Sequence, residues 1–346
     1  MALNSYVTAQ QRGMDLSIER RRVVVTATPE MPVDMGVVSG ELGPLAELEV
    51  VPLPFGDMSL GARERSWRSI ALADGLLVRT GVIPYELIGR CTRLRIIALH
   101  GAGVDQVDTK AATEGGIYVT NTPGANAQSV AELVLGLIIS FRRRIAEANS
   151  LVRQGRWEQA RTLGRELKGR RLGLVGYGNI GQTLARLASA LGMEVVFWSR
   201  SPHSPLQRGV AQVSLEEVFA TADVVSLHVA LTTETAGLVG RKLLSLMRKD
   251  ALLVNTARGA LIAQDDLLQA LQEGWFAGAA LDVFEQEPLP TNSPFLRMTN
   301  VILTPHMGGS TVECLARVAG IAARDIRLVL EGREPQFAVN SPWPSR

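Results

Sequence analysis

The sequence has few of the residues that would place it in a specialised structural class. Its 346 residues include only two cysteines, Cys91 and Cys314, which lie far apart and lack metal-ligand spacing. A disulfide framework is therefore excluded, and reduced cysteines are typical of a cytoplasmic protein. The longest apolar run, residues 133–141, is too short to cross a membrane and is expected to be a buried helix.

Lysine is also scarce, whereas arginine is abundant. Four lysines stand beside 32 arginines, yet 36 basic and 34 acidic residues give a net charge of only +2. This balance argues against a nucleic-acid or membrane-surface partner. At most positions, including Arg20–Arg22 and Arg142–Arg144, the arginine excess is interpreted as compositional background. An arginine fork nevertheless suits carboxylates and phosphates, so arginines at strand ends need separate consideration.

Short β-branched segments alternate with helical patterns, which indicates an α/β protein with parallel sheets. A first series of strands is predicted at residues 23–26, 48–51, 75–78, 96–99 and 117–119. A second series is predicted at residues 172–175, 195–197, 224–227, 252–254, 278–281 and 301–303. One long helix is expected over residues 127–154 with Asn126 as its N-cap, and a last helix over residues 311–331 that returns to the first series.

A glycine-rich turn opens the second series. Gly176, Gly178 and Gly181, in GYGNIG, follow the strand at residues 172–175 and precede a helical pattern. In such a turn the backbone approaches a pyrophosphate at a helix N-terminus, so this motif predicts a dinucleotide site. The next strand ends in Ser199-Arg200-Ser201, where an acidic residue would hold the ribose of NAD. Hydroxyls and an arginine suit a 2′-phosphate instead, so NADP is favoured over NAD.

Only four histidines are available for acid/base chemistry near neutral pH. His306 directly follows the predicted strand at residues 301–303, and the two preceding strands are followed by Arg258 and Glu287. The carboxyl ends of parallel strands share one edge, so these three side chains are expected beside the nucleotide. A carboxylate next to imidazole favours its protonated form, and an arginine fork binds a carboxylate.

Several motifs together resemble the D-isomer-specific 2-hydroxyacid dehydrogenase family over most of the chain. They are GYGNIG, NTARG, ALDVFEQEP and TPHMGGST, preceded by LLVRTG, HGAGVDQVD and NTPGANAQSVAEL. The resemblance implies an α/β fold in which a Rossmann dinucleotide-binding domain is inserted into a smaller flavodoxin-like substrate domain. The expected division is a flexible extension at residues 1–18, a substrate domain at 19–125 plus 311–346, and an NAD(P)-binding domain at 126–310.

The same resemblance assigns roles to individual residues. Arg258 would anchor the substrate carboxylate, Glu287 would pair with the histidine, and His306 would act as general acid/base. The residues expected to bind the cofactor are Gly176, Gly178, Asn179, Ile180, Gly181, Ser199, Arg200, Ser201, Val229, Thr256, Ala257, Arg258, Asp282, His306, Gly308 and Gly309. The residues expected to hold the substrate are Arg79, His100, Gly101, Ala102 and Gly103. No metal site is expected, and the family implies a homodimer.

The predicted reaction is hydride transfer between NAD(P)H and a small 2-oxo acid, with glyoxylate or hydroxypyruvate favoured. Phosphoglycerate and phosphite are alternative substrates for a site of this composition. Formate is disfavoured, because formate dehydrogenases resemble one another in carrying glutamine where this chain has Glu287. A dinucleotide-sensing corepressor-like binding protein is the alternative from a different functional class.

Overall fold

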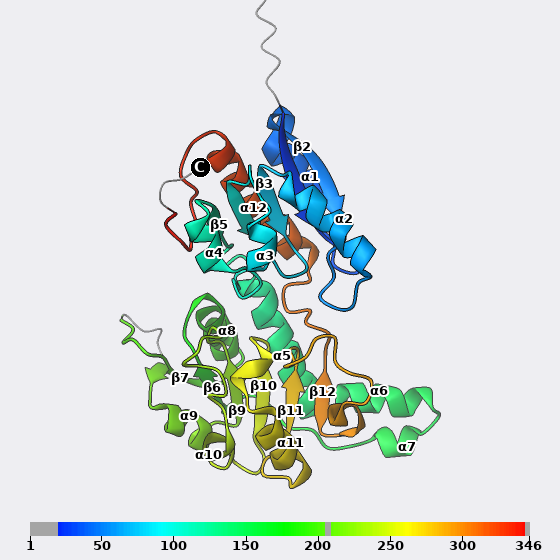
Figure 1. The fold of residues 1–346 in the computed structure, drawn as a ribbon. Coiled ribbons are helices and arrows are strands. Elements are labelled where there is room, and N and C mark those ends of the chain that lie inside the picture. Colours follow the sequence, from blue (N-terminus) through cyan, green and yellow to red (C-terminus); the bar gives the residue numbers. More distant parts are fainter. Residues whose placement is uncertain (1–19, 205–208, 343–346) are drawn as a thin grey trace, which may run out of the picture.

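The computed structural model describes residues 20–204 and 209–342 and contains two parallel sheets, one above the other in Figure 1. The extension expected at residues 1–18 lies outside the described residues. The predicted α/β fold with parallel sheets is confirmed. Both sheets are covered by helices on their two faces, as all-parallel sheets require.

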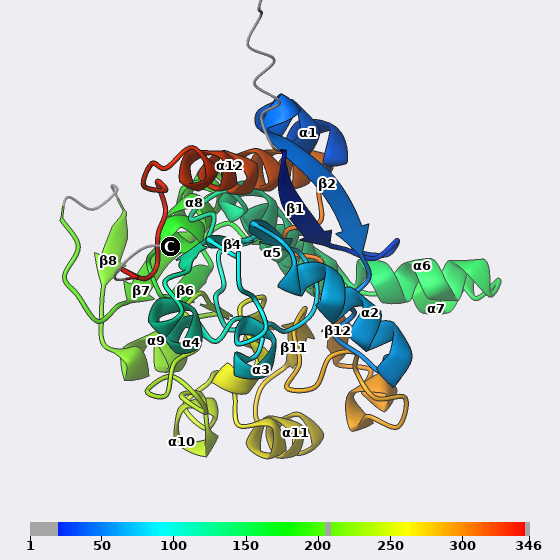
Figure 2. The ribbon, with the colours of Figure 1, turned by 45° about the horizontal axis from the view of Figure 1, so that its top comes forward.

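The first sheet has the strand order β2-β1-β3-β4-β5, the flavodoxin-like order, with all neighbours parallel. Its strands are β1 (Arg21–Thr26), β2 (Ala46–Val51), β3 (Gly75–Val78), β4 (Ile96–Leu99) and β5 (Tyr118–Thr120). One face packs against α2 (Leu60–Ala71), α3 (Tyr85–Ile88) and α4 (Thr109–Glu114). The opposite face packs against α1 (Met35–Leu42) and the last helix, α12 (Val312–Leu330), which lie side by side in Figure 2.

The second sheet has the order β12-β11-β10-β9-β6-β7-β8, again with parallel neighbours. Its strands are β6 (Arg171–Val175), β7 (Glu194–Trp198), β8 (Val210–Gln212), β9 (Val224–Leu227), β10 (Leu252–Asn255), β11 (Gly278–Leu281) and β12 (Val301–Leu303). One face packs against α5 (Ala127–Arg143) and α8 (Asn179–Ala190). The other packs against α9 (Leu215–Thr221), α10 (Arg241–Leu244) and α11 (Gln264–Gln272). This is the dinucleotide-binding order with one further strand, β12, at its edge.

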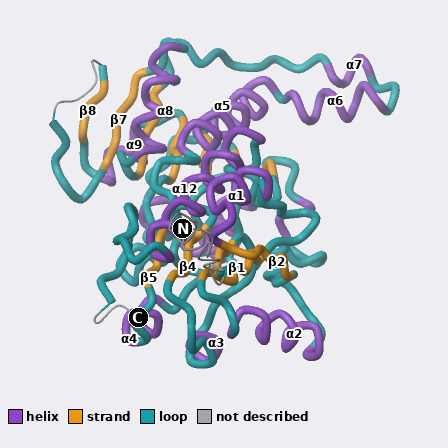
Figure 3. The backbone as a smooth tube through the Cα atoms, turned by 90° about the horizontal axis from the view of Figure 1, so that it is seen from above, coloured by secondary structure: helices purple, strands orange, loops and turns teal. Residues whose placement is uncertain are grey.

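One strand of the second sheet and one long helix differ from the predictions. Six strands were expected, but β8 is a seventh; it has three residues, two of them exposed, and therefore lacks an apolar pattern. The single helix expected over residues 127–154 is two helices, because Arg144 adopts a left-handed conformation with φ 54° between α5 and α6 (Ile145–Arg153). Asn126 precedes α5, but its side chain makes no capping hydrogen bond. Figure 3 shows α6 and α7 (Trp157–Ala160) projecting away from the rest of the protein.

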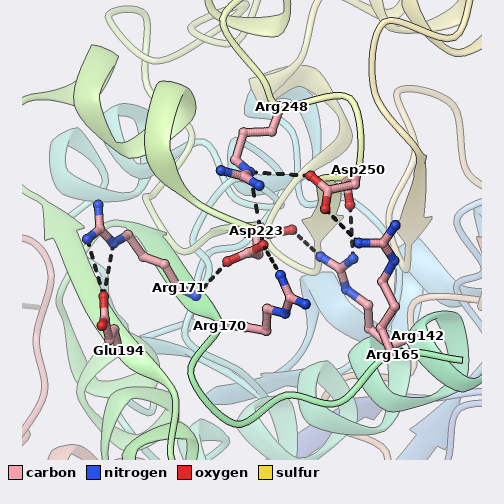
Figure 4. Close-up of polar contacts among 8 residues, drawn as sticks. All are labelled: Arg142, Arg165, Arg170, Arg171, Glu194, Asp223, Arg248 and Asp250. Carbon is pink, nitrogen blue, oxygen red and sulfur yellow. Dashed lines mark hydrogen bonds and ion pairs between the residues drawn. The ribbon is translucent and has the colours of Figure 1, made fainter.

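The end of α5 is held by a network of arginines and aspartates (Figure 4). Arg142 is only 6% exposed and donates hydrogen bonds to the main-chain oxygens of Asp223 and Asp250. Arg165 and Arg248 bind the carboxylate of Asp250 at 2.8 and 3.3 Å. The interpretation of Arg142 as compositional background was therefore wrong. Its guanidinium adds charge-assisted hydrogen bonds to both carbonyl groups, one of which, that of Asp223, also accepts the Leu252 N–H at 3.0 Å.

The chain crosses twice between the two sheets, once between β5 and α5 and once between β12 and α12. The two crossings are linked where Ser129 Oγ and Thr311 Oγ1 lie 2.8 Å apart in a hydrogen bond. Thr311 also caps α12 by accepting a hydrogen bond from the Cys314 N–H. The loops that follow the strands of the two sheets consequently face one another across this junction.

Candidate active site

Three side chains that suit acid/base and carboxylate chemistry meet at the carboxyl edge of the second sheet. Arg258 follows β10, Glu287 follows β11 and His306 follows β12, and these three strands are adjacent. His306 Nδ1 and Glu287 Oε2 are 2.7 Å apart. The charges of Arg258 and His306 both act on the Glu287 carboxylate. The predicted grouping of these residues at one sheet edge is confirmed.

The histidine and the glutamate form an oriented hydrogen-bonded pair. Glu287 Oε1 accepts a hydrogen bond from the Phe284 N–H at 2.9 Å, which fixes the carboxylate while Oε2 faces the imidazole. Burial alone would raise the pKa of Glu287, but the hydrogen bond and charge of His306 outweigh it, so its pKa is lowered. An ionised Glu287 stabilises a protonated His306, and Nε2 is left as the nitrogen that points away from the carboxylate.

Asp282 holds the loop that carries His306. This carboxylate is fully buried and accepts hydrogen bonds from Thr304 Oγ1 at 2.6 Å and from the N–H groups of Met307 and Gly308 at 2.9 Å. The main chain of His306 is left-handed, with φ 51°, and its N–H donates to the Asp282 carbonyl at 2.7 Å. A non-glycine residue in this conformation needs such support. Asp282, expected to bind the cofactor, is fully enclosed by these contacts.

Arg258 is held from both sheets. Its Nη1 donates to the Ala257 carbonyl at 2.7 Å, and Asn255 Nδ2 donates to the Arg258 carbonyl at 2.8 Å. Its Nη2 and Nε bind Asp105, which follows β4 of the first sheet, at 3.0 and 3.1 Å. Asp105 lies in the HGAGVDQVD motif but was not singled out from the sequence. The only signal for it was a carboxylate in a loop expected to face Arg258.

The glycine-rich turn fits a dinucleotide phosphate. Gly176 has φ +105°, and a Cβ there would lie 2.6 Å from the His228 carbonyl oxygen. A Cβ on Gly178 would meet no atom within 4 Å, so the turn is open on the side where α8 begins. The unpaired N–H groups of a helix N-terminus favour an anion at this position.

The other residues expected to bind the cofactor lie along the same carboxyl edge. Asn179, Ile180 and Gly181 begin α8, and the remaining positions follow their strands: Ser199, Arg200 and Ser201 after β7, Val229 after β9, Thr256 and Ala257 after β10, Asp282 after β11, and Gly308 and Gly309 after β12. Thr256 is buried, and its hydroxyl has no hydrogen-bond partner among the described residues. Such a group is available to a bound molecule.

The segment after β7 is polar and ordered by internal hydrogen bonds. Ser199 Oγ donates to the Ser201 carbonyl at 2.6 Å, and Gln212 Nε2 donates to Ser199 Oγ at 3.2 Å. Arg200 Nη1 lies 3.2 Å from Glu234 Oε2, with the two side chains 74% and 73% exposed. An ion pair this exposed contributes little free energy, so the guanidinium remains available to another anion.

The expected substrate loop follows β4 at the junction of the sheets. A Cβ on Gly103 would lie 1.8 Å from Arg258 Nη2, so only glycine allows this approach. Ala102 is exposed, whereas His100 is 6% exposed and Arg79 is partly buried. Burial and the charge of Arg79 lower the pKa of His100 to about 3. The backbone of Gly101–Gly103 is thus more accessible than the His100 ring, which was expected to contact substrate.

The remaining histidines are less suited to proton transfer than His306. Burial lowers the pKa of His228 to about 4, so this ring, like that of His100, is neutral near pH 7. His203 packs edge-on against Tyr177 and Phe197, with ring centroids 5.3 and 5.6 Å away.

Within residues 20–204 and 209–342, no group of three or more metal-ligating side chains could hold a metal ion. Helices in the same ranges are all too short or too polar to span a membrane.

Comparisons with known proteins agree with this geometry. Residues 135–308 match a family model described as the NAD binding domain of D-isomer specific 2-hydroxyacid dehydrogenase. The chain is 40% identical over 299 residues to a glyoxylate reductase of Aeropyrum pernix, covering 84% of this chain and 87% of the relative. It is 41% identical over 286 residues to a D-3-phosphoglycerate dehydrogenase of Methanocaldococcus jannaschii, covering 81% of this chain but 54% of that longer protein.

A solved structure extends the likeness to three dimensions. It is a glyoxylate/hydroxypyruvate reductase from Sinorhizobium meliloti, described as NADPH-dependent and solved with NADP and malonate. The TM-score is 0.79 at 29% identity, over 92% of this chain and 97% of that one.

Proposed function

The chain belongs to the D-isomer specific 2-hydroxyacid dehydrogenase family, and we propose that it reduces the carbonyl group of a small 2-oxo acid with NAD(P)H. Glyoxylate and hydroxypyruvate are the favoured substrates, because the relatives reported above include reductases of these acids. The observation that carries the proposal is the 2.7 Å pair of His306 and Glu287 beside Arg258. His306 can supply a proton, and Arg258 can bind the substrate carboxylate, at the same edge of the second sheet.

The glycine-rich turn and the start of α8 would hold the pyrophosphate of the dinucleotide. The open side of Gly178 supports this assignment. The Thr256 hydroxyl, which has no partner within the described part of the chain, would be available to another part of the dinucleotide. When bound, the nicotinamide supplies the hydride that reduces the substrate carbon. The protein's own residues have to bind the substrate, orient its carbonyl group and deliver a proton.

In the proposed mechanism His306 is the general acid. Glu287 holds Nδ1, so the proton on Nε2 faces the developing alkoxide and is transferred to it as the carbonyl is reduced. The negative Glu287 stabilises the imidazolium before transfer and maintains ring orientation afterwards. Arg258 binds the substrate carboxylate and stabilises charge on the carbonyl oxygen. The backbone of Gly101–Gly103, with Arg79 and His100 behind it, would close the site from the first sheet.

We further propose NADPH as the preferred cofactor. Arg200 lies after β7 with a guanidinium that is exposed, and the hydroxyls of Ser199 and Ser201 flank it. An arginine can bind a 2′-phosphate, which NADH lacks. Replacing Arg200 with alanine should raise KM for NADPH roughly tenfold and change KM for NADH little, in line with the loss of one charge-assisted contact. A clear preference of the wild-type enzyme for NADH would contradict this proposal.

The division of the chain and its assembly are also proposals. Residues 19–125 and 311–346 would form the substrate domain and 126–310 the nucleotide domain, in a cytoplasmic homodimer. Support for the dimer comes from the projecting segment of α6 and α7, where Ile145, Val152 and Trp157 are 51%, 43% and 63% exposed. Apolar groups on a projecting arm are suited to a second copy. Light scattering of the intact protein would test this, since a monomer contradicts it.

Assays of 2-oxo acids with NADPH and NADH test the proposed reaction. Glyoxylate and hydroxypyruvate should give the highest kcat/KM, whereas a preference for phosphohydroxypyruvate would favour the phosphoglycerate activity of the Methanocaldococcus relative. NADP-dependent oxidation of phosphite would favour the phosphite alternative. Binding of the dinucleotide without turnover of any of these compounds would favour a dinucleotide sensor.

A His306→Ala variant tests the acid. Its kcat should fall roughly a hundred- to ten-thousandfold, while KM for NADPH changes little, because the imidazole acts on the substrate oxygen. Unchanged turnover would refute the assignment.

A further inference from the structure

Asp105 is a carboxylate of the first sheet that reaches the anchor arginine of the second. Its Oδ1 lies 3.0 Å from Arg258 Nη2, and its Oδ2 lies 3.1 Å from Arg258 Nε. The two residues are 153 positions apart in sequence. Their contact is a two-point pair of the kind that fixes both the position and the plane of a guanidinium.

The hydrogen bonds of Arg258 can be assigned donor by donor. A guanidinium has five N–H groups. The Nε–H and one Nη2–H face Asp105, and one Nη1–H faces the Ala257 carbonyl at 2.7 Å. Among the described residues, one N–H on Nη1 and one on Nη2 are therefore left without an acceptor, and together they can form the two-pronged end of the guanidinium. That end is the one suited to a substrate carboxylate or carbonyl oxygen.

Gly103 leaves the room that this pair occupies. The Arg258 fork lies against Gly103, where a Cβ would come within 1.8 Å of Nη2 and 2.8 Å of Asp105 Oδ1. Burial alone would raise the pKa of Asp105, but the hydrogen bonds and charge of Arg258 outweigh it, and His306 adds to the effect, so its pKa is lowered. Asp105 is thus an ionised partner near neutral pH, in the field of both groups proposed to contact the substrate.

We propose that Asp105 is the positioning residue that presents the two free N–H groups of Arg258 to the substrate, and that this arrangement forms only when the loop after β4 meets the second sheet. The inference rests on the proposed function for the identity of the substrate. What is new is that Arg258, which binds the substrate carboxylate from the second sheet, is oriented by Asp105 of the first sheet. Arg258 alone, without Asp105, would sample other orientations and lose part of its affinity for a 2-oxo acid.

A competing role for Asp105 predicts the opposite result. If Asp105 occupied the place of the substrate carboxylate, removing it would free Arg258 and tighten binding. Positioning instead predicts weaker binding, because an unoriented fork loses a charge-assisted contact. The sign of the change in affinity therefore separates the two roles.

The test uses the full chain with Asp105→Ala, Asp105→Asn and, as a matched control, Asp108→Asn. Asp108 lies in the same loop and accepts the Ala111 N–H as the cap of α4, a role that asparagine also fills. KM for glyoxylate should rise roughly ten- to hundredfold in Asp105→Ala, with a smaller change in kcat. The KM of Asp105→Asn for glyoxylate should lie between the values of Asp105→Ala and wild type, because the amide oxygen of asparagine still accepts one of the two Arg258 N–H groups.

Binding of oxamate to the complex with NADPH gives a second readout that does not need turnover. Its Kd should rise by the same factor as KM, while KM for NADPH and the melting temperature remain at wild-type values. Unchanged or tighter oxamate binding in Asp105→Ala would overturn the inference, and so would an equal loss in Asp108→Asn. A wild-type protein that reduces no 2-oxo acid would overturn the proposed function, whereas oxamate binding would still decide the role of Asp105.

Discussion

Replacing His100 with glutamine should make the stability of this protein less sensitive to acid. Folding buries the His100 ring to 6% exposure beside Arg79, and its pKa falls to about 3. In the unfolded chain a histidine has a pKa of about 6.5. As the pH falls below about 6.5, the unfolded chain binds a proton that the folded protein does not, so stability is lost.

The size of this loss follows from the separation of the two pKa values. Each pH unit below the unfolded pKa costs about 1.4 kcal/mol until the folded pKa is approached. At about pH 5 the neutral ring of His100 therefore costs roughly 2 kcal/mol of folding free energy relative to pH 8. This is a measurable part of the ~5–15 kcal/mol by which a domain is typically stable. The full effect, near pH 3, would approach about 5 kcal/mol.

Urea unfolding of wild type and His100→Gln at about pH 8 and pH 5 measures the effect. The difference in unfolding free energy between the two pH values should be smaller by about 2 kcal/mol in the variant. Because each protein is compared with itself at the two pH values, any loss of stability that the substitution causes at both pH values cancels. A second variant, His100→Asn, serves the same purpose if glutamine packs poorly. If both variants lose as much stability as wild type between the two pH values, His100 is not held neutral by the fold.

Three further substitutions test the supports of the site and of the fold. Arg142→Ala should lower the free energy of unfolding by about 2–4 kcal/mol, measured by thermal or urea unfolding, because a buried arginine that donates charge-assisted hydrogen bonds to two main-chain carbonyl groups is lost; an unchanged melting temperature would contradict this. Asp282→Asn should lower kcat about tenfold or more in steady-state assays, because the amide nitrogen that replaces one carboxylate oxygen cannot accept the N–H group bound to that oxygen and so loosens the His306 loop. Glu287→Gln should lower kcat about a hundredfold near neutral pH, because a neutral amide does not stabilise the imidazolium; wild-type turnover would remove Glu287 from the mechanism.

The strands and the acid/base pair were predictable because their signals are local. Segments such as β3, β4 and β9 are entirely buried and read as short apolar runs. His306 follows β12, a short apolar run that is partly buried, after a threonine and a proline. The left-handed turn at Arg144 was not predictable, since helix-forming residues stand on both sides of it. The short, mostly exposed strand β8 offered no pattern either.

Contacts between distant segments account for the parts of the site that sequence reasoning missed. Asp105 and Arg258 are brought together by two different sheets, so spacing along the chain gives no indication of their pairing. The burial of His100 and Asp282 depends likewise on helices and loops that pack over them. A pattern indicated which strand each residue follows, but not whether its side chain faces solvent or the interior.

The return of α12 to the first sheet sets an order for folding during synthesis. The strands β1 to β5 leave the ribosome first, but one face of their sheet is covered by residues of α12 such as Ala319, Ala322 and Ile326. About 190 residues separate the end of β5 from the start of α12, which corresponds to ~10–40 s of translation. The second sheet is contiguous and can be completed within that interval. Although α1 covers part of this face early, the part that α12 covers stays exposed in the nascent first sheet until the last helix emerges, and in this period the sheet is open to non-native contacts.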